Sequence, residues 1–81
     1  MFSPCSSIPL VVEAIFDKNG NVTPIAVISE GGRYEIDHIY GVHSHTPVGI
    51  PGLAKEYECK IGCHRRSLYY VKDGNTWWSL R

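Results

Sequence analysis

Short runs of alternating apolar and polar residues follow one another along this chain and predict a succession of β-strands. The clearest alternation covers residues 33–40, where Tyr34 and Ile36 lie on one face and charged residues lie on the other. No helical period extends beyond a single turn, so the fold class is expected to be all-β. Five or six strands are predicted, at residues 10–17, 22–29, 33–40, 56–61, 64–72 and 76–80.

Pairs of residues that contain glycine separate these runs and predict where the chain reverses. Such pairs supply the positive φ that two-residue hairpin turns require. The strands are therefore expected to be antiparallel and to neighbour one another in sequence order. The pairs are Asn19-Gly20, Gly31-Gly32, Ile61-Gly62 and Asp73-Gly74.

Two residues break the regular strand pattern. Pro24 has no N–H to donate to a ladder, so it is expected at an edge, at a bulge or at the start of a strand. Ile39 falls on the polar face of its run, which predicts a bulge or bend near Asp37–His38 that switches the face. The alternation therefore predicts no register beyond Ile36.

The length of the chain limits the architecture. Eighty-one residues make one domain, expected at residues 9–81 behind a flexible tail at residues 1–8. Residues 41–53, rich in Gly and Pro, are expected to form one long irregular connection.

Short sequential strands leave sheet edges open unless the sheet closes on itself. A small antiparallel meander barrel of five or six strands, SH3-like in proportions, is therefore preferred. The alternatives are a two-layer β-sandwich and a sheet completed by dimerisation. The expected core is Val12, Ala14, Phe16, Ile25, Val27, Tyr34, Ile36, Tyr57, Cys59, Leu68 and Tyr70.

The charges of the chain cancel but are unevenly distributed. Eight basic and eight acidic residues give no overall electrostatic case for a nucleic-acid or membrane partner. Residues 1–50 hold two basic and five acidic residues, whereas residues 51–81 hold six basic and three acidic ones. This asymmetry fits either two differently charged faces or the ordinary pairing of opposite charges on neighbouring strands.

The cysteines indicate the cellular compartment. Cys5, Cys59 and Cys63 leave at least one thiol unpaired, which argues against a secreted disulfide framework. The first ten residues lack the basic region of a signal peptide. No apolar stretch approaches the ~18 residues that a membrane helix requires. A cytoplasmic location with no membrane partner is expected.

Two segments, DKNGNVTPIAVISEGGRYEIDHI and EYECKIGCHRRSLYYVKDGNTWW, carry a distinctive order of structural residues. A glycine, an arginine and an aromatic residue precede a hydrophobic strand, and a Leu-aromatic strand and a tryptophan strand close the chain. In this order residues 11–80 resemble short uncharacterised bacterial proteins. The resemblance implies a compact β domain of unknown function and assigns no chemical role to any residue. The Cys63-His64 pair is not part of it.

A cluster of cysteine and histidine residues is the candidate metal site. Zinc takes thiolate and imidazole ligands in a tetrahedron, and such ligands can flank a tight hairpin. The candidates are Cys59, Cys63 and His64 together with His43 or His45. Alternatively, Cys59 is a small buried apolar residue, and Cys63 and His64 are exposed turn residues. No cofactor is expected, with zinc as the alternative.

An enzyme would need a constellation that the sequence does not supply. A cysteine nucleophile at Cys63 requires an adjacent base such as His64, His43 or His45. Neighbours on a regular strand point to opposite faces, so Cys63 and His64 are not expected to meet. The acidic pairs, Glu35 with Asp37 and Glu56 with Glu58, belong to solvent faces. The chain is therefore expected not to be an enzyme.

Binding is the expected kind of function. Basic residues interleaved with aromatic residues suit the stacking of bases and the tracking of phosphates. The candidate nucleic-acid-binding residues are Lys60, Arg65, Arg66, Tyr69, Lys72 and Trp78. Alternatively, the aromatic rings belong to the core and the arginine stems cover apolar surface. We expect a non-enzymatic protein-interaction module that binds a protein partner or itself, with a nucleic-acid-binding barrel and a zinc-binding domain as alternatives.

Overall fold

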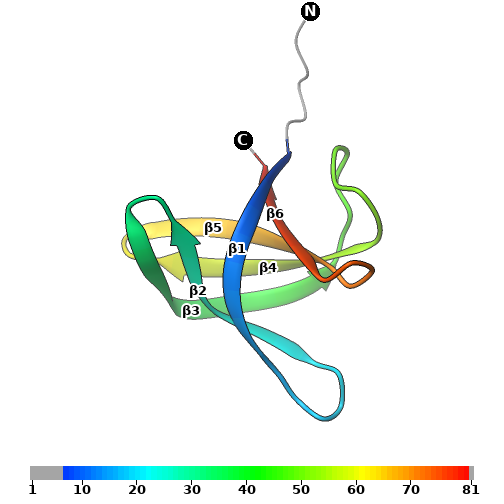
Figure 1. Cartoon of the computed structure of the whole chain (residues 1–81), viewed down its shortest axis with the longest axis horizontal. Helices are drawn as coiled ribbons and strands as arrows, with labels where there is room; N and C mark the ends of the chain where they lie inside the picture. Colours follow the sequence, from blue (N-terminus) through cyan, green and yellow to red (C-terminus); the bar gives the residue numbers. More distant parts are fainter. Residues whose placement is uncertain (1–6, 81) are drawn as a thin grey trace, which may run out of the picture.

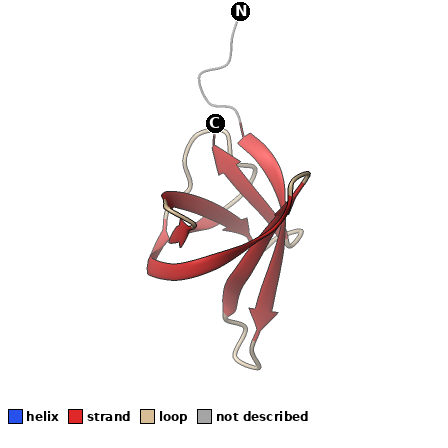
Figure 2. Cartoon of the chain, turned by 90° about the vertical axis from the view of Figure 1, so that its left-hand side faces the viewer, coloured by secondary structure: helices blue, strands red, loops and turns tan. Residues whose placement is uncertain are grey.

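Six antiparallel strands form a closed barrel in the computed structural model, which describes residues 7–80. The strands pair in sequence order, and β6 pairs with β1 to complete the circle. Figure 2 shows strands and the loops that join them, without a helix. The strands are β1 Ser7–Phe16, β2 Val22–Ser29, β3 Gly32–Ser44, β4 Ala54–Ile61, β5 His64–Val71 and β6 Thr76–Leu80.

Two long strands close the barrel because each changes its partner midway. Residues 7–10 of β1 pair with β6, and residues 11–16 pair with β2. Likewise, β3 pairs first with β2 and then, from Ile36 onward, with β4. A strand shared by two sheets lets the sheet curl over itself and removes the open ends of a flat meander. This closure confirms the barrel, and the β-sandwich alternative is wrong.

The strand boundaries follow the predictions most closely where turns are tight. β2 and β6 have the predicted bounds. The predicted tail at residues 1–8 extends too far, because Ser7 and Ile8 pair with Leu80 and Ser79. The rest of that predicted tail, residues 1–6, lies outside the described residues. β3 continues to Ser44, so the irregular connection comprises residues 45–53 and not 41–53.

The four predicted reversals are all present, but only two are two-residue turns. Gly62 and Cys63 join the paired residues Ile61 and His64, and Gly62 has the positive φ of 63° that the first position of such a turn requires. The turn between β2 and β3 is equally short, because Ser29 pairs with Gly32. The connections at residues 17–21 and 72–75 are longer than predicted.

Asp17 accounts for the longer connection between β1 and β2. Its carboxylate accepts hydrogen bonds from the backbone N–H groups of Asn19 at 2.8 Å and Asn21 at 2.9 Å. The hydrogen bonds from Asn21, backbone first, lower the pKa of the Asp17 carboxyl. A side chain that bonds its own loop in this way favours a wider turn over a two-residue one.

Both predicted irregularities are confirmed. Glu13 pairs with Ala26 but the next residue of β1, Ala14, pairs with Pro24, so Ile25 is the extra residue of a bulge. β3 shifts register between Ile36 and His38 and again between Ile39 and Gly41. These shifts place Ile39 opposite buried Cys59 and therefore toward the interior.

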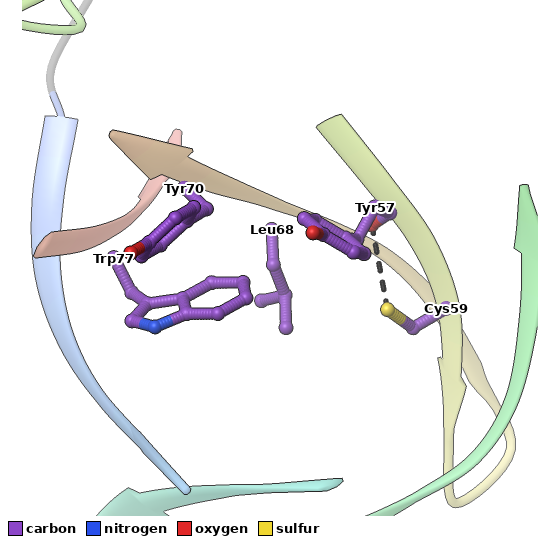
Figure 3. Packing of buried hydrophobic residues seen from close by; sticks show 5 residues of the cluster. All are labelled: Tyr57, Cys59, Leu68, Tyr70 and Trp77. Atoms are coloured by element: carbon purple, nitrogen blue, oxygen red, sulfur yellow. Dashed lines mark hydrogen bonds between the residues drawn. The ribbon is translucent and has the colours of Figure 1, made fainter. Parts of the chain in front are cut away.

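The core fills the barrel with side chains from three consecutive strands. In Figure 3 the ring of Trp77 lies against Tyr70, and Leu68 lies between Trp77 and Tyr57. The ring centroids of Trp77 are 4.8 Å from Tyr70 and 5.3 Å from Tyr57. Cys59 completes this buried cluster, and its thiol donates to the carbonyl oxygen of Tyr57 at 3.4 Å. The central cluster is thus mainly aromatic and comes from the second half of the chain, and partly buried residues of β1, β2 and β3 pack against it.

Most of the predicted core residues belong to this cluster or pack against it, with three exceptions. Phe16 makes an edge contact with the ring of Tyr70, centroids 6.3 Å apart, but is 53% exposed because the β1–β2 hairpin projects beyond the barrel, as Figure 1 shows. Tyr34 is 45% exposed because it lines the open end described below. Ile25, the bulge residue, is half-buried and lies outside the cluster. Either Trp77 or Trp78 was expected to help fill the barrel, and it is Trp77 that lies in the central cluster.

A second apolar cluster lies on the outside of the barrel. Ile50, from the connection between β3 and β4, packs against Ala54, Tyr69 and Val71. The hydroxyl of Thr46 holds this connection in place by accepting the backbone N–H of Ala54 at 2.8 Å. The connection therefore covers part of the outer face of β4, β5 and β6.

Candidate functional site

A cavity of about 1010 Å³ opens at one end of the barrel. Its walls include residues of all six strands, the turn between β4 and β5 lies at its rim, and Ser29 and Arg33 on either side of the β2–β3 turn also line it. Both turns are at the left of Figure 1. Leu10, Val27 and Leu68 supply apolar wall, and Tyr34 lies among them. Its size is at the upper end of the ~300–1,000 Å³ typical of ligand sites.

The cavity lies where β6 leaves β5. β6 pairs with residues 69–71 of β5, and its last residue, Leu80, pairs with Ser7 of β1. Within residues 7–80, no strand pairs with residues 64–68 of β5 on the side away from β4. This segment therefore presents an unpaired strand edge.

The unpaired edge of β5 runs along the cavity. Every residue from 61 to 69 lines it, although successive side chains of a strand point to opposite faces. If the cavity touched only one face of β5, every second residue would line it. Because residues of both faces line it, the cavity borders the unpaired edge of the strand. Backbone donors and acceptors are thus available beside an apolar wall.

The rim of the cavity is held by one long-range hydrogen bond. The carboxylate of Asp37 accepts the backbone N–H of Gly62 at 2.9 Å and so ties the β4–β5 turn to β3. Cys63, the second residue of that turn, is an exposed free thiol. The start of β5 is therefore anchored to β3 as well as paired with β4, although no strand pairs with it on the side away from β4 within residues 7–80.

The arginines at the cavity differ in their partners. Arg33 donates to the carboxylates of Glu13 and Glu35, each at 2.8 Å, and these bonds raise the pKa of its guanidinium. Arg65 lies 3.6 Å from a carboxylate oxygen of Glu58. The side chain of Arg66 makes no ion pair or hydrogen bond with any other residue in the range 7–80.

Lys60 and Arg65, two of the predicted nucleic-acid-binding residues, face each other across β4 and β5. They belong to the outer face, where the guanidinium of Arg65 lies 4.2 Å above the ring centre of Tyr40. Glu58 on the same face also bonds the imidazole of His43 at 2.9 Å. Arg65 therefore has a carboxylate beside it, and its guanidinium covers one face of Tyr40.

The other four predicted nucleic-acid-binding residues are dispersed. Tyr69 and Trp78 pair on the outer face, but Tyr69 is only 6% exposed beneath the β3–β4 connection. Burial first, and then the hydrogen bond to Glu56, raise the pKa of its hydroxyl. Arg66 lies on the opposite face of the sheet, and Lys72 lies in the β5–β6 turn. The six residues therefore form no continuous patch for stacking and phosphate contacts.

The structure separates the candidate zinc ligands. Cys59 is fully buried in the core, whereas Cys63 is exposed in the β4–β5 turn beside His64. His43 is bonded to Glu58 on the outer face, and His45 lies 6.4 Å from the ring of Tyr69. In the part of the chain that is described, no three His, Cys, Asp or Glu side chains gather as a metal site would require. The geometry gives the zinc prediction no support.

Tyr34, Leu10 and Val27 line the cavity without having been predicted as site residues. The sequence holds one signal for their position. The strand predicted at residues 64–72 is longer than the last strand at residues 76–80, so part of it must lack a neighbour. Which side chains surround that gap depends on how the barrel closes.

Comparisons with protein-family models, with curated proteins and with solved structures each found no match. Residues 7–80 include no helix long and apolar enough to span a membrane. The fold alone therefore defines the class of protein. It is a small antiparallel β-barrel whose strands pair in a closed circle and which has a cavity at one end.

Proposed function

We propose that this chain is a small, non-enzymatic interaction module that binds an extended segment of a partner protein. The segment adds as a strand to residues 64–68 of β5. The observation that carries this proposal is the unpaired edge of β5 along an apolar cavity. Proteins commonly use such edges to bind peptides, with backbone hydrogen bonds for affinity and pockets for specificity.

The dimensions of the edge suit a short segment. Five unpaired residues of β5 accommodate a partner strand of about 17 Å, at roughly 3.4 Å per residue. Alternate side chains of the bound strand would face Leu68, Val27 and Leu10, and the others would face solvent. A partner segment with alternating apolar residues fits this environment best.

A short peptide tests strand addition directly. The probe is SVTVQVTS, N-acetylated and C-amidated, and the control is SVTVPVTS, whose proline removes an N–H and cannot continue a strand. We expect SVTVQVTS to shift the backbone amide NMR signals of residues 64–68 and to slow their hydrogen exchange, and SVTVPVTS to do neither. Equal effects of both peptides, or none at millimolar concentration, would refute strand addition.

Several broader expectations accompany the proposal. The free thiols of Cys59 and Cys63 support a reducing, cytoplasmic location. The closed meander of six strands supports the expected SH3-like proportions. The resemblance of residues 11–80 to short uncharacterised bacterial proteins supports a bacterial origin for this β domain.

A further inference from the structure

We propose that Arg66 selects the segment that binds β5, and that the partner is an acidic extended segment with a carboxylate side chain opposite Arg66. This inference rests on the proposed strand addition at the same edge. It names the chemistry of the partner, which strand addition alone leaves open.

Arg66 faces the cavity. It pairs directly with Cys59, and paired residues of an antiparallel ladder lie on the same face of the sheet. Cys59 is fully buried inside the barrel, so Arg66 also belongs to the interior face. Arg66 is nevertheless exposed, because it lies where the barrel opens, and it lines the cavity.

Arg66 is the arginine left without a carboxylate. Of the three arginines in residues 7–80, Arg33 bonds two carboxylates and Arg65 lies beside Glu58. No carboxylate oxygen in the described part of the chain lies within 4.0 Å of Arg66. The carboxylates that line the cavity are engaged elsewhere, Glu35 with Arg33 and Asp37 with the Gly62 N–H. The open end therefore has, beside its apolar wall, one guanidinium without a carboxylate within 4.0 Å in the described residues.

The register of strand addition places one side chain of the partner near this charge. Side chains opposite each other on an antiparallel pair have Cβ atoms about 4.5–5.5 Å apart. A glutamate opposite Arg66 can therefore reach the guanidinium and form a charge-assisted hydrogen bond, which is stronger than a neutral one. Residues two positions away on the same face would meet Leu68, where an apolar side chain fits.

A second copy of this chain is a poor occupant of the edge. Residues 64–68 contain Arg65 and Arg66 and no carboxylate. Two such edges paired about a two-fold axis would bring four arginines together, and like charges on facing strands are destabilising. The charge of the edge favours an acidic partner over self-association.

Three peptides that differ at one position test the selection. We compare SVTETVTS, SVTQTVTS and SVTKTVTS by NMR titration of the whole chain, because in each peptide the valines two positions from the varied residue share its face and can meet the apolar wall. We expect the glutamate peptide to bind about fivefold or more tightly than the glutamine peptide, a difference of roughly 1 kcal/mol, and the lysine peptide to bind most weakly.

Two protein variants locate the effect. In R66Q the glutamate and glutamine peptides are expected to bind equally, because the unpaired charge is gone. The matched control is R65Q, which removes a neighbouring arginine from the outer face and is expected to keep the preference. Both side chains are exposed, so unchanged melting curves would verify that both variants fold.

The possible results distinguish the role of Arg66 from strand addition at β5 itself. Binding of all three peptides with equal affinity, or a preference that survives R66Q, overturns the role of Arg66 and leaves strand addition standing. Binding of none removes both. A ten-nucleotide oligothymidylate that shifts residues 64–68 more strongly than the glutamate peptide overturns the acidic-segment proposal in favour of a nucleic acid. A molar mass that doubles with protein concentration, with the shifts at residues 64–68, overturns it in favour of a second copy.

Discussion

The hydroxyl of Tyr57 donates a 2.8 Å hydrogen bond to the carbonyl oxygen of Val22, joining β4 to the first residue of β2 through the barrel. In the described chain, β3 pairs only with residues 26–29 of β2, so residues 22–25 lack a partner on that side. The side-chain bond therefore replaces ladder hydrogen bonds where two strands diverge. We expect Y57F to lower the free energy of unfolding by about 1 kcal/mol in urea titrations.

Y34F is the matched control for this bond. The Tyr34 hydroxyl makes no hydrogen bond to another residue within 7–80, and the side chain is 45% exposed. Its replacement should change the free energy of unfolding by less than about 0.5 kcal/mol. Equal losses in Y57F and Y34F would show that the bond to Val22 contributes nothing.

Cys59 should make the barrel sensitive to alkaline pH. Burial raises the pKa of its thiol from 9.0 to about 11, so the folded state keeps the proton longer than the unfolded chain does. The stabilisation is fully present below pH 9 and is lost as the pH rises to about 11. We expect a loss of ~2–3 kcal/mol in the free energy of unfolding across this range.

C59A isolates this contribution from other alkaline groups. Burial also raises the pKa of Tyr57, so the wild-type chain has a second source of alkaline sensitivity. The quantity to measure is the difference between the wild-type and C59A slopes of unfolding free energy against pH. Parallel curves from pH 8 to pH 11 would contradict a buried thiol with a raised pKa.

The two cysteines of the described chain should react at very different rates. Cys63 is exposed, whereas Cys59 is 0% exposed and protonated at neutral pH. We expect C63S to remove one fast-reacting thiol from a native labelling experiment. C59A should remove one thiol that reacts only after urea is added. Fast native labelling that depends on Cys59 would contradict the buried position.

Trp77 should be the most costly residue to truncate. Its ring packs on Tyr57 and Tyr70, and the side chain is only 5% exposed. We expect W77L to lower the free energy of unfolding by about 3 kcal/mol. The adjacent Trp78 is half-buried on the outer face, so W78L should cost less than half as much. Equal costs would place the centre of the core elsewhere.

Asp17 should contribute to stability only above acidic pH. Hydrogen bonds from Asn21 lower its pKa below 3.8, so the folded state favours the carboxylate. That stabilisation is present above this pH and is lost as the pH falls through the lower, folded-state pKa. D17N keeps an acceptor oxygen but no charge, so its melting temperature should fall less than that of the wild type between pH 5 and pH 2. D17A should melt lower than D17N at pH 7.

Local chemistry explains why much of the fold could be predicted. Gly62 needs a positive φ, Pro24 lacks an N–H, and Ile39 breaks the polar face of its strand. Each of these constraints acts within a few residues, so the turns and bulges follow from the chain itself. The connection at Asp17 was predicted too short because its hydrogen bonds involve a side chain that the turn pair alone does not reveal.

The candidate site was less predictable, because its residues come from strands distant in the sequence. The alternation of β5 correctly separates Arg65 from Arg66, but the prediction combined them in one nucleic-acid surface. Only the register with β4 shows that Arg66 shares a face with buried Cys59 and Arg65 does not. For the same reason, the spacing of the Cys and His residues did not reveal that they lie apart.

The sequence by itself determined the strands, the order in which they pair and the places where the ladder shifts, because alternation, backbone φ and missing donors are local properties. The tertiary structure decided which edge stays unpaired, which side chains surround the opening and which arginine lacks a carboxylate. These depend on where β6 leaves β5 to pair with β1. Closure of a barrel is a geometric condition on all six strands together, and no segment of the chain contains it.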